Sequence, residues 1–376
     1  MNCLKPAEIE KIVEPFLAKK SKINLVVGLM AGNTDIIMGF GDFSESSSVK
    51  PDGKTLFEIG SITKVFTTTL LSSLVNRREL HLDTSVASLI SKYKNLPEYI
   101  TLESLATHTS GLPRIPDNLL KSARQNMANP YAAYSQVDLD EYLASYDGKS
   151  SKTVGKISYS NLGMGLLGYI LAQHLNLDYE EAIKTFIRNP LELSDTSITL
   201  TEEQKARLAI GRSAKGKPVS NWDIPTLGGA GALKSHGEDM LKFLRANLQP
   251  SQTNLGEAII EGQQMRCTEF PTPPTISKIL SQISRFFPNQ TKVKTEIKGI
   301  ALGWFISDLK SVEKQVYWHN GGTGGYRCFC GFVKETDTAV VVLANYADGI
   351  LNQLRGYSVD TLGMQILEKM NSIETF

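Results

Sequence analysis

A serine and a lysine three residues apart, Ser61 and Lys64, could together form an acyl-transfer nucleophile. On a helix, positions i and i+3 lie on one face, so the Lys64 amine could accept the proton of the Ser61 hydroxyl. The hydroxyl oxygen would then attack a carbonyl carbon. The spacing alone does not identify this pair, because it recurs elsewhere in the chain. The other pairs are Ser47/Lys50, Ser91/Lys94, Ser307/Lys310 and Ser311/Lys314.

The sequence around Ser61 distinguishes it from the other serines. Gly60 ends an extended run, and apolar residues follow at helical spacing from Ile62 to Val75. We therefore expect Ser61 at the N-terminal end of a buried helix, where free backbone N–H groups favour developing negative charge. The other pairs lie in serine-rich, polar or charged segments that would not bury a lysine. The structural alternative is a helix-capping serine beside a solvated Lys64.

The bulk properties describe a globular protein with a substantial core. The 376 residues, 41% of them hydrophobic, suffice for one large domain or two joined ones. A formal net charge of +1 gives no electrostatic case for nucleic acid, so we expect a small-molecule or peptide substrate. No run reaches the ~18 apolar residues that cross a bilayer, and no oligomer is indicated. Residues 1–22 lack a signal-peptide core, which predicts a cytoplasmic protein, or a periplasmic one if a leader is missing.

The four cysteines do not predict a disulfide framework or a metal centre. Cys3 and Cys267 are scattered, whereas Cys328 and Cys330 would point to the same face of a strand. No histidine or cysteine stands at ligand spacing from this last pair, so we expect it to pack in the core. We predict no metal and no cofactor.

Strand patterns occur near both ends of the chain, and helical patterns dominate the middle. The predicted strands are Asn24–Met30, Asp35–Phe40, Ile300–Ile306, Gln315–His319, Arg327–Val333 and Ala339–Asn345. We predict an α+β fold in which residues 1–79 and 229–376 form one antiparallel sheet flanked by helices. Residues 80–228 would form an inserted, mainly helical region, and a cleft between the two parts would be a natural ligand site.

Residues 269–298 differ from the rest of the chain in composition. Four prolines surround an amphipathic stretch with six isoleucine, leucine and phenylalanine residues. We interpret this segment as a possible lid that presents an apolar face to the cleft. An additional helix packed on the core is the structural alternative, and a membrane-surface role is a third.

Three further clusters follow Ser61 and Lys64 in order along the chain. They are Leu105–Pro113, Ser158–Gly163 and Trp318–Gly325. With these motifs the chain resembles the serine β-lactamase and penicillin-binding-protein superfamily, on the branch of class C β-lactamases, D-alanyl-D-alanine carboxypeptidases and related esterases. That family has a Ser-x-x-Lys helix, a Tyr-x-Asn element and a Lys-Thr-Gly or His-x-Gly strand end. The resemblance runs from about Leu25 to Asn345, and only residues 269–298 lack a counterpart.

The resemblance implies an acyl-enzyme on Ser61, with Lys64 and Tyr159 as general bases and acids. Lys64 can accept a proton only if burial or neighbouring cations lower its pKa well below the ~10.4 of a free lysine. Tyr159 would relay a proton to the leaving group, and we expect nearby positive charge to lower its pKa. Asn161 would orient the acyl amide of the substrate and hold Lys64 in place.

The third cluster implies a substrate-binding strand end formed by His319, Asn320 and Gly321. His319 replaces the lysine of many family members, and at a strand end facing the cleft it could donate a hydrogen bond or titrate near neutral pH. This difference favours an ester, amide or other acyl substrate over a β-lactam or D-Ala-D-Ala peptide. Gly321 would let a substrate backbone approach closely. The oxyanion hole is implied at the backbone N–H groups of Ser61 and Gly322.

Several functions remain open at this point. His108 is an alternative base, but no Gly-x-Ser-x-Gly elbow accompanies it, and in the family its segment is a structural turn. A serine hydrolase, a penicillin-binding carboxypeptidase or class C-type β-lactamase, and an acyl transferase or cyclase would all use the acyl-enzyme. A non-catalytic ligand-binding protein on the same scaffold would not. The complete serine, lysine, tyrosine and asparagine set favours an enzyme, because a pure binder does not need a proton relay.

Overall fold

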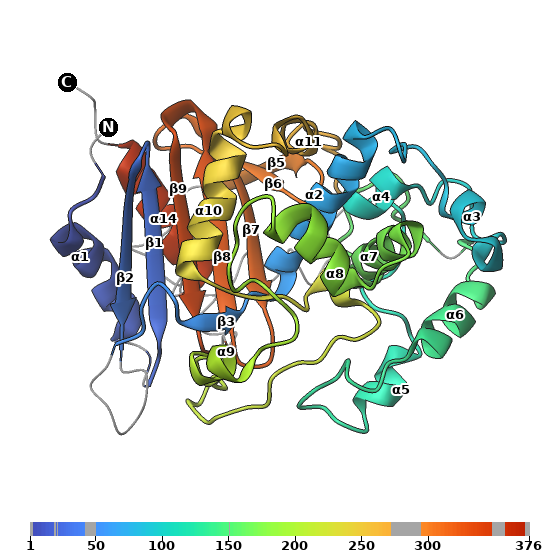
Figure 1. The fold of residues 1–376 in the computed structure, drawn as a ribbon, viewed down its shortest axis with the longest axis horizontal. Coiled ribbons are helices and arrows are strands. Elements are labelled where there is room, and N and C mark those ends of the chain that lie inside the picture. Colours follow the sequence, from blue (N-terminus) through green and yellow to red (C-terminus); the bar gives the residue numbers. More distant parts are fainter. Residues whose placement is uncertain are drawn as a thin grey trace.

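A seven-stranded antiparallel sheet forms the centre of the protein (Figure 1). The structure, a computed structural model, describes residues 3–18, 20, 22–41, 50–149, 151–271, 295–347 and 358–372. Strands from both ends of the chain pair in the order β2-β1-β9-β8-β7-β6-β5, which confirms the predicted fold class. The strands are β1 Leu25–Ala31, β2 Thr34–Phe40, β5 Thr295–Ile300, β6 Phe305–Leu309, β7 Lys314–Gly322, β8 Arg327–Val333 and β9 Thr338–Ala344.

The central strands are hydrophobic on both faces because the sheet is covered on both faces. Every residue of β1 and β9 is buried, whereas the edge strand β2 is partly exposed. Successive side chains of a strand point to opposite faces. Val341 and Leu343 accordingly belong to one hydrophobic core, and Val340 and Val342 belong to the other.

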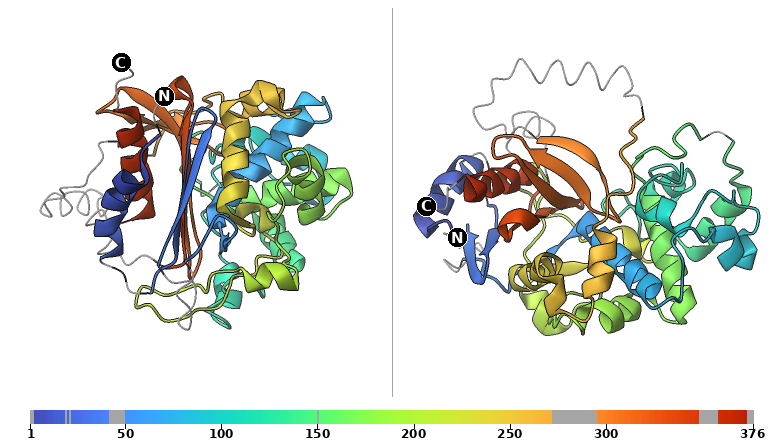
Figure 2. Two further views of the ribbon diagram at one scale, coloured as in Figure 1. Left: turned by 60° about the vertical axis from the view of Figure 1, so that its left-hand side comes forward. Right: turned by 90° about the horizontal axis from the view of Figure 1, so that it is seen from above.

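Helices form a layer on each side of the sheet (Figure 2). On one side, α1 (Pro6–Leu17) and α14 (Val359–Asn371) bury their apolar residues in the smaller core. On the other side, α10 (Gly237–Leu248), α2 (Thr63–Asn76) and α11 (Gly256–Gly262) contribute to the larger core. The larger core continues into the helical region and so joins that region to the sheet.

The prediction of a single strand over Ile300–Ile306 is wrong, because the chain turns within this run. Residues 301–304 connect β5 to β6, and the N–H of Ala301 donates to the carbonyl of Trp304 at 2.8 Å. Gly303 has a φ of +77°, a backbone conformation that favours glycine. The turn residues are themselves buried, so hydrophobicity does not fall where the direction changes.

The middle of the chain is mainly helical and adds no strand to the seven-stranded sheet within the described residues. Its α-helices are α3 Val86–Leu89, α4 Leu102–Ala106, α5 Leu119–Ala123, α6 Gln136–Ser145, α7 Asn161–Leu175, α8 Tyr179–Ile183 and α9 Glu202–Ala206. A second, two-stranded sheet pairs β3 (Leu56–Glu58) with β4 (Lys234–His236) beside this region, and the sequence did not predict it. The boundaries at residues 79/80 and 228/229 stay a prediction.

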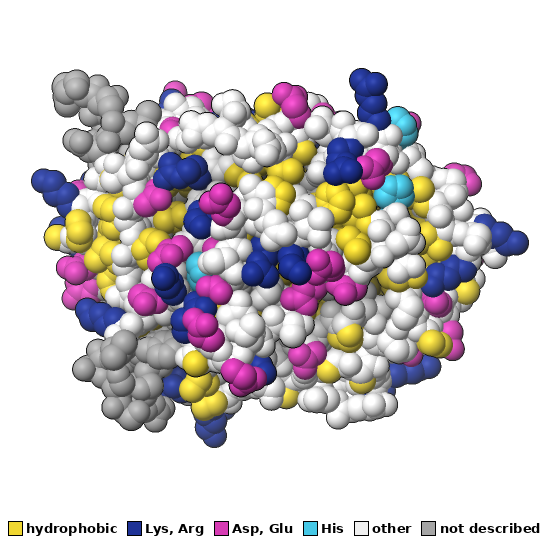
Figure 3. All heavy atoms as spheres, viewed as in Figure 1, with side chains coloured by type: hydrophobic (Ala, Val, Ile, Leu, Met, Phe, Trp, Pro, Cys, Tyr) yellow, Lys and Arg dark blue, Asp and Glu magenta, His cyan; other side chains and the backbone are white. Residues whose placement is uncertain are grey.

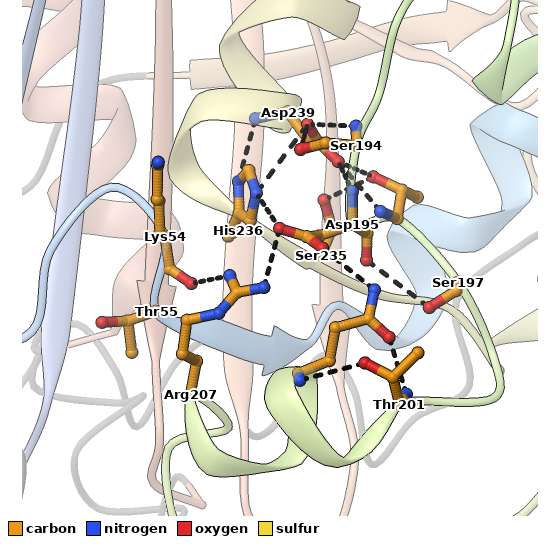
Figure 4. Close-up of polar contacts among 12 residues, drawn as sticks. Lys54, Thr55, Ser194, Asp195, Ser197, Thr201, Arg207, Ser235, His236 and Asp239 are labelled. Atoms are coloured by element: carbon orange, nitrogen blue, oxygen red, sulfur yellow. Dashed lines mark hydrogen bonds and ion pairs between the residues drawn. The ribbon is translucent and has the colours of Figure 1, made fainter.

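A fully hydrogen-bonded polar cluster ties a loop of the helical region to the start of α10 (Figure 4). The buried carboxylate of Asp239 accepts from the backbone N–H groups of Ser194, Asp195 and Thr196 at 2.8–2.9 Å. His236 caps α10 by accepting the Asp239 N–H through Nδ1 at 3.1 Å. Its Nε2 lies 3.1 Å from the Asp195 carboxylate. We call these residues the Asp239 cluster.

The remaining sequence predictions concern the surface, the cysteines and the lid. No helix in the described part of the chain is long and apolar enough to cross a membrane. On the face shown in Figure 3, lysine and arginine side chains are interspersed with aspartate and glutamate. Cys328 and Cys330 are buried in the larger core, as predicted. Of the predicted lid, residues 272–294 lie outside the described residues, and residues 295–298 belong to β5.

Candidate active site

Ser61 and Lys64 are adjacent in space, in a buried setting. Ser61 lies in a 3₁₀ turn over Gly60–Ile62, and α2 begins two residues later at Thr63. The Nζ of Lys64 lies 2.9 Å from the Oγ of Ser61 and donates to the carbonyl of Ala230 at 2.5 Å. The Lys64 side chain is buried completely, because the first three turns of α2 are enclosed by the core.

Two glycines allow the turn that carries Ser61 to lie against β7. Gly60 has a φ of +51°, and a Cβ there would lie 2.6 Å from the backbone nitrogen of Gly322. A Cβ on Gly321 would lie 1.9 Å from the carbonyl oxygen of Ile59. The packing of the chain itself therefore requires glycine at position 321, and the close approach of a substrate there stays a prediction.

The environment of Lys64 favours its neutral form. Burial lowers the pKa of Lys64 well below its ordinary value of 10.5, and the positive charge of Arg114 lowers it further. A buried ammonium loses its hydration, and within the described residues the Lys64 amine finds hydrogen-bond partners in one carbonyl and one hydroxyl, with no carboxylate. A neutral amine 2.9 Å from a serine hydroxyl can act as a general base. This meets the condition set above for Lys64.

Tyr159 contacts both reacting groups. Its hydroxyl is hydrogen-bonded to Ser61, and its ring centroid lies 4.8 Å from the Nζ of Lys64 and 5.0 Å from the guanidinium carbon of Arg114. Burial raises the pKa of Tyr159, and it outweighs the lowering by the Ser61 hydrogen bond and by Arg114. Positive charge does lower this pKa, as predicted, but the net shift is upward because burial has the larger effect. Tyr159 is therefore a phenol that can donate a proton.

Asn161 begins α7 and lines the same cavity as Ser61. Its Nδ2 donates to the hydroxyl of Tyr131 at 3.2 Å, and its buried Oδ1 has no hydrogen-bond partner among the described residues. We predicted that Asn161 would hold Lys64 in place. Among the described residues, the hydrogen bonds of the Lys64 amine instead reach Ser61 and the Ala230 carbonyl, and that carbonyl is the contact that fixes it.

His319 occupies the predicted strand but does not face the cavity. Its side chain is buried completely, and its Nδ1 lies 2.6 Å from the carbonyl oxygen of Asn320. Burial lowers the pKa of His319 to about 3, with a smaller contribution from Lys64. The predictions that His319 faces the cleft and titrates near neutral pH are therefore wrong. Asn320 does line the cavity, and its Nδ2 donates to the carboxylate of Asp360 at 2.8 Å.

His108 packs directly against the reacting tyrosine. Its backbone has a φ of +59°, and its Nδ1 accepts the N–H of Ser160 at 3.3 Å. The ring centroids of His108 and Tyr159 are 4.5 Å apart, and burial lowers the pKa of His108 well below its ordinary value. No serine hydroxyl bonds to it among the described residues. His108 is thus a turn residue, as the family suggested, that also supports Tyr159.

A cavity of about 630 Å³ has the nucleophile in its wall. Its lining comprises Ser61, Arg114, Ile115, Tyr131, Tyr159, Asn161, Trp222, Phe305, Asn320, Gly321, Gly322, Thr323, Arg327, Val359 and Asp360. The sequence motifs supplied the serine, tyrosine, asparagine and strand-end residues of this set. They missed the arginines, Tyr131 and Trp222; the only available signal was that Arg114 directly follows the Leu105–Pro113 cluster.

The sequence and the fold of this chain are similar to those of known proteins. A family model described as Beta-lactamase matches residues 9–357. A β-lactamase of Providencia stuartii is 26% identical over 354 residues, covering 90% of this chain and 86% of that protein. The D-alanyl-D-alanine-carboxypeptidase/endopeptidase AmpH of Escherichia coli is 23% identical over 332 residues, covering 85% and 80%. The class C β-lactamase structure from Rhodobacter sphaeroides has a TM-score of 0.73 and 25% identity, covering 96% of this chain and 99% of that one.

Proposed function

Because the chain belongs to the Beta-lactamase family and is a serine hydrolase, we propose that it acts on an ester, amide or peptide through an acyl-enzyme on Ser61. One observation carries this proposal. The amine of Lys64, whose pKa is lowered by burial, lies 2.9 Å from the Ser61 hydroxyl inside the wall of a cavity. A nucleophile beside a desolvated base is the arrangement that acyl transfer needs.

In the acylation step, the Ser61 oxygen attacks the substrate carbonyl carbon and a C–O bond forms. The hydroxyl proton passes to the Nζ of Lys64. The backbone N–H groups of Ser61 and Gly322 stabilise the negative charge on the carbonyl oxygen, and losing one such donor costs roughly 3 kcal/mol in other enzymes. The bond to the leaving group then breaks, and Tyr159 donates its phenolic proton to the departing atom. The proton held by Lys64 restores the phenol.

In the deacylation step, a water molecule replaces the leaving group and attacks the acyl carbon. Its proton passes to the neutral amine of Lys64. The ester bond to Ser61 breaks as the Ser61 oxygen takes the phenolic proton of Tyr159, and the proton held by Lys64 restores the phenol. The products are a free carboxylic acid and the restored enzyme. If an alcohol or amine entered in place of water, the same chemistry would give acyl transfer.

A penicillin-binding D-alanyl-D-alanine carboxypeptidase, or a class C-type β-lactamase, is the second candidate. The similarity to AmpH and to class C β-lactamase structures favours it. The buried, neutral His319 disfavours it, because this position then supplies no cation for a substrate carboxylate. A non-catalytic binding protein is the third candidate. It would not need a buried lysine beside a serine, since such a lysine is costly to bury.

Intact-mass spectrometry with three reagents separates these candidates. The protein is exposed to a fluorophosphonate, a penicillin and a short-chain nitrophenyl ester. We expect a covalent adduct that is lost in Ser61→Ala and retained in Ser91→Ala, a matched serine of another Ser-x-x-Lys spacing. A penicillin adduct without ester turnover would support the second candidate. Absence of any adduct on Ser61, with ester turnover kept in Ser61→Ala, would overturn the proposal.

A further inference from the structure

We propose that Arg114 makes this site select acyl donors that carry an anionic group on the acyl part of the molecule. This proposal rests on the proposed acyl-enzyme function and specifies its substrate class. Arg114 lines the same cavity as Ser61, and its side chain is exposed to solvent. Among the described residues its guanidinium has no hydrogen bond and no carboxylate within ion-pair distance, and it lies over the ring of Tyr159. A planar donor group of this kind suits a carboxylate or phosphate.

The backbone of Arg114 is held at the start of α7. Its carbonyl oxygen accepts the N–H of Asn161 at 2.8 Å and the N–H of Leu162 at 3.3 Å, which are donors that a helix start leaves free. The hydroxyl of Ser160 donates to the carbonyl of Pro113 at 2.7 Å. Arg114 and Asn161 are therefore positioned together on the helical side of the cavity. These hydrogen bonds fix the backbone of Arg114, and its guanidinium can still bind a ligand.

The charges on the two sides of the cavity differ. The described lining contains three charged side chains, Arg114, Arg327 and Asp360. On the sheet side, the Nη1 of Arg327 already donates to the carbonyls of Thr323 and Tyr326 at 2.6 and 2.7 Å, and Asp360 brings a negative charge. On the helical side, Arg114 is the only charged lining residue described. An anionic group would therefore be attracted to the helical side, where Asn161 also lies.

The charge of Arg114 also reaches the reacting groups. It contributes to the lowered pKa of Lys64 and opposes the burial that raises the pKa of Tyr159. Replacing Arg114 will therefore change the acylation rate of every substrate. The charge selectivity must be measured as a ratio between two substrates, because the field effect is common to both and cancels.

The test compares two esters with acyl chains of equal carbon number, the mono-4-nitrophenyl ester of glutaric acid and 4-nitrophenyl pentanoate. The quantity is the ratio of kcat/KM for the anionic ester to that for the neutral ester. We expect Arg114→Gln to lower this ratio by roughly tenfold, as for loss of a charge-assisted pair, and Arg114→Lys to keep most of it. Added salt should lower the wild-type ratio but leave that of Arg114→Gln nearly unchanged.

Arg327→Gln is the matched control on the sheet side of the cavity, and its ratio should stay within about threefold of wild type. A ratio unchanged in Arg114→Gln and insensitive to salt in the wild type would overturn the proposal. A ratio lowered in Arg327→Gln but not in Arg114→Gln would also overturn it. If neither ester acylates Ser61 in the wild type, the proposed function fails, which is a separate outcome. The salt series uses only the wild-type protein and therefore tests the proposal even if a variant fails to fold.

Discussion

Two buried polar clusters in this protein differ in how completely they are hydrogen-bonded. In the Asp239 cluster (Figure 4), both carboxylate oxygens of Asp239 accept hydrogen bonds, and both ring nitrogens of His236 have partners. We call Ser61, Lys64, Tyr159, His108 and His319 the reacting cluster. In it, the Nε2 atoms of His108 and His319 have no hydrogen-bond partner among the described residues.

The difference between the clusters indicates that one contributes to stability and the other to reactivity. Satisfied buried polar groups stabilise a fold, whereas buried groups that lack partners cost free energy. In the reacting cluster, burial shifts the pKa values of Lys64, Tyr159, His108 and His319, each against its charged form. Shifted pKa values of this kind are typical of catalytic sites. We infer that the Asp239 cluster supports the fold and that the reacting cluster reduces stability in exchange for reactivity.

The largest expected effect is on the acylation rate. Lys64→Met should slow covalent labelling of Ser61 by a fluorophosphonate roughly 10³-fold, because the nucleophile loses its base. The control is Lys234→Met, which removes another buried lysine whose Nζ donates to the carbonyl of Ile198 at 3.0 Å. Its labelling rate should stay within about threefold of wild type. Equal losses in both variants would mean that any buried lysine matters and would remove the distinction between the regions.

The next effect is on stability. Asp239→Asn should lower the free energy of unfolding by about 3 kcal/mol, because an amide N–H₂ would face backbone donors in place of an accepting oxygen. Urea unfolding should show a lower midpoint with an unchanged slope, while the labelling rate of Ser61 per folded molecule stays the same.

Asp178→Asn is the matched control for this substitution. Asp178 is an exposed cap of α8 that accepts the N–H of Glu181 at 2.8 Å. Asparagine caps a helix nearly as well as aspartate, so the expected cost is below about 0.5 kcal/mol. If the two variants lost equal stability, the Asp239 cluster would have no special role in the fold.

A smaller effect of opposite sign is expected for the stability of Lys64→Met. Methionine fills a similar volume without a buried amine, so the free energy of unfolding should rise by about 1 kcal/mol. The folded state releases a proton that the unfolded state keeps, so wild-type stability should fall as the pH falls below ~10.4. The gain in Lys64→Met should therefore increase toward lower pH. Urea unfolding at several pH values measures this, and a loss of stability in the variant would contradict the account.

The smallest effect is spectroscopic. The hydrogen bonds place the ring proton of His108 on Nε2, since its Nδ1 accepts the Ser160 N–H, and that of His319 on Nδ1, which faces a carbonyl. Nitrogen-15 NMR should show these opposite tautomers with no titration between about pH 5 and 8. His236, whose Nδ1 accepts a backbone N–H, should show its proton on Nε2. The same tautomer for His108 and His319 would contradict the assigned geometry.

Much of the fold was predictable because its central strands carry strong patterns. The predicted strands near β1, β2, β8 and β9 match the observed ones to within one residue at each end. The prediction failed where tertiary packing hides the local signal. The turn at residues 301–304 is buried, so the run through β5 and β6 looks continuous. The three-residue strands β3 and β4 are too short to show an alternating pattern.

The sequence predicted those residues of the candidate site that lie in the ordered motifs. Ser61, Tyr159 and Asn161 line one cavity, and Lys64 lies behind Ser61. The sequence could not show that the His319 side chain is completely buried, because the burial of a strand side chain depends on what packs against its face. Nor could the sequence show that burial raises the pKa of Tyr159 more than the charge of Arg114 lowers it. For this reason the predicted direction of the net shift is wrong.

The pH dependence of Ser61 labelling by a fluorophosphonate tests the central claim most directly. The fluoride leaving group does not need a proton, so the profile reports the base that activates Ser61. With Lys64 as a neutral, desolvated base, the labelling rate should rise with pH through a pKa well below the 10.5 of an ordinary lysine and then stay flat. In Lys64→Met this rise should be absent. A wild-type rate that continues to rise to the ordinary lysine pKa, or a rise that persists in Lys64→Met, would contradict the account.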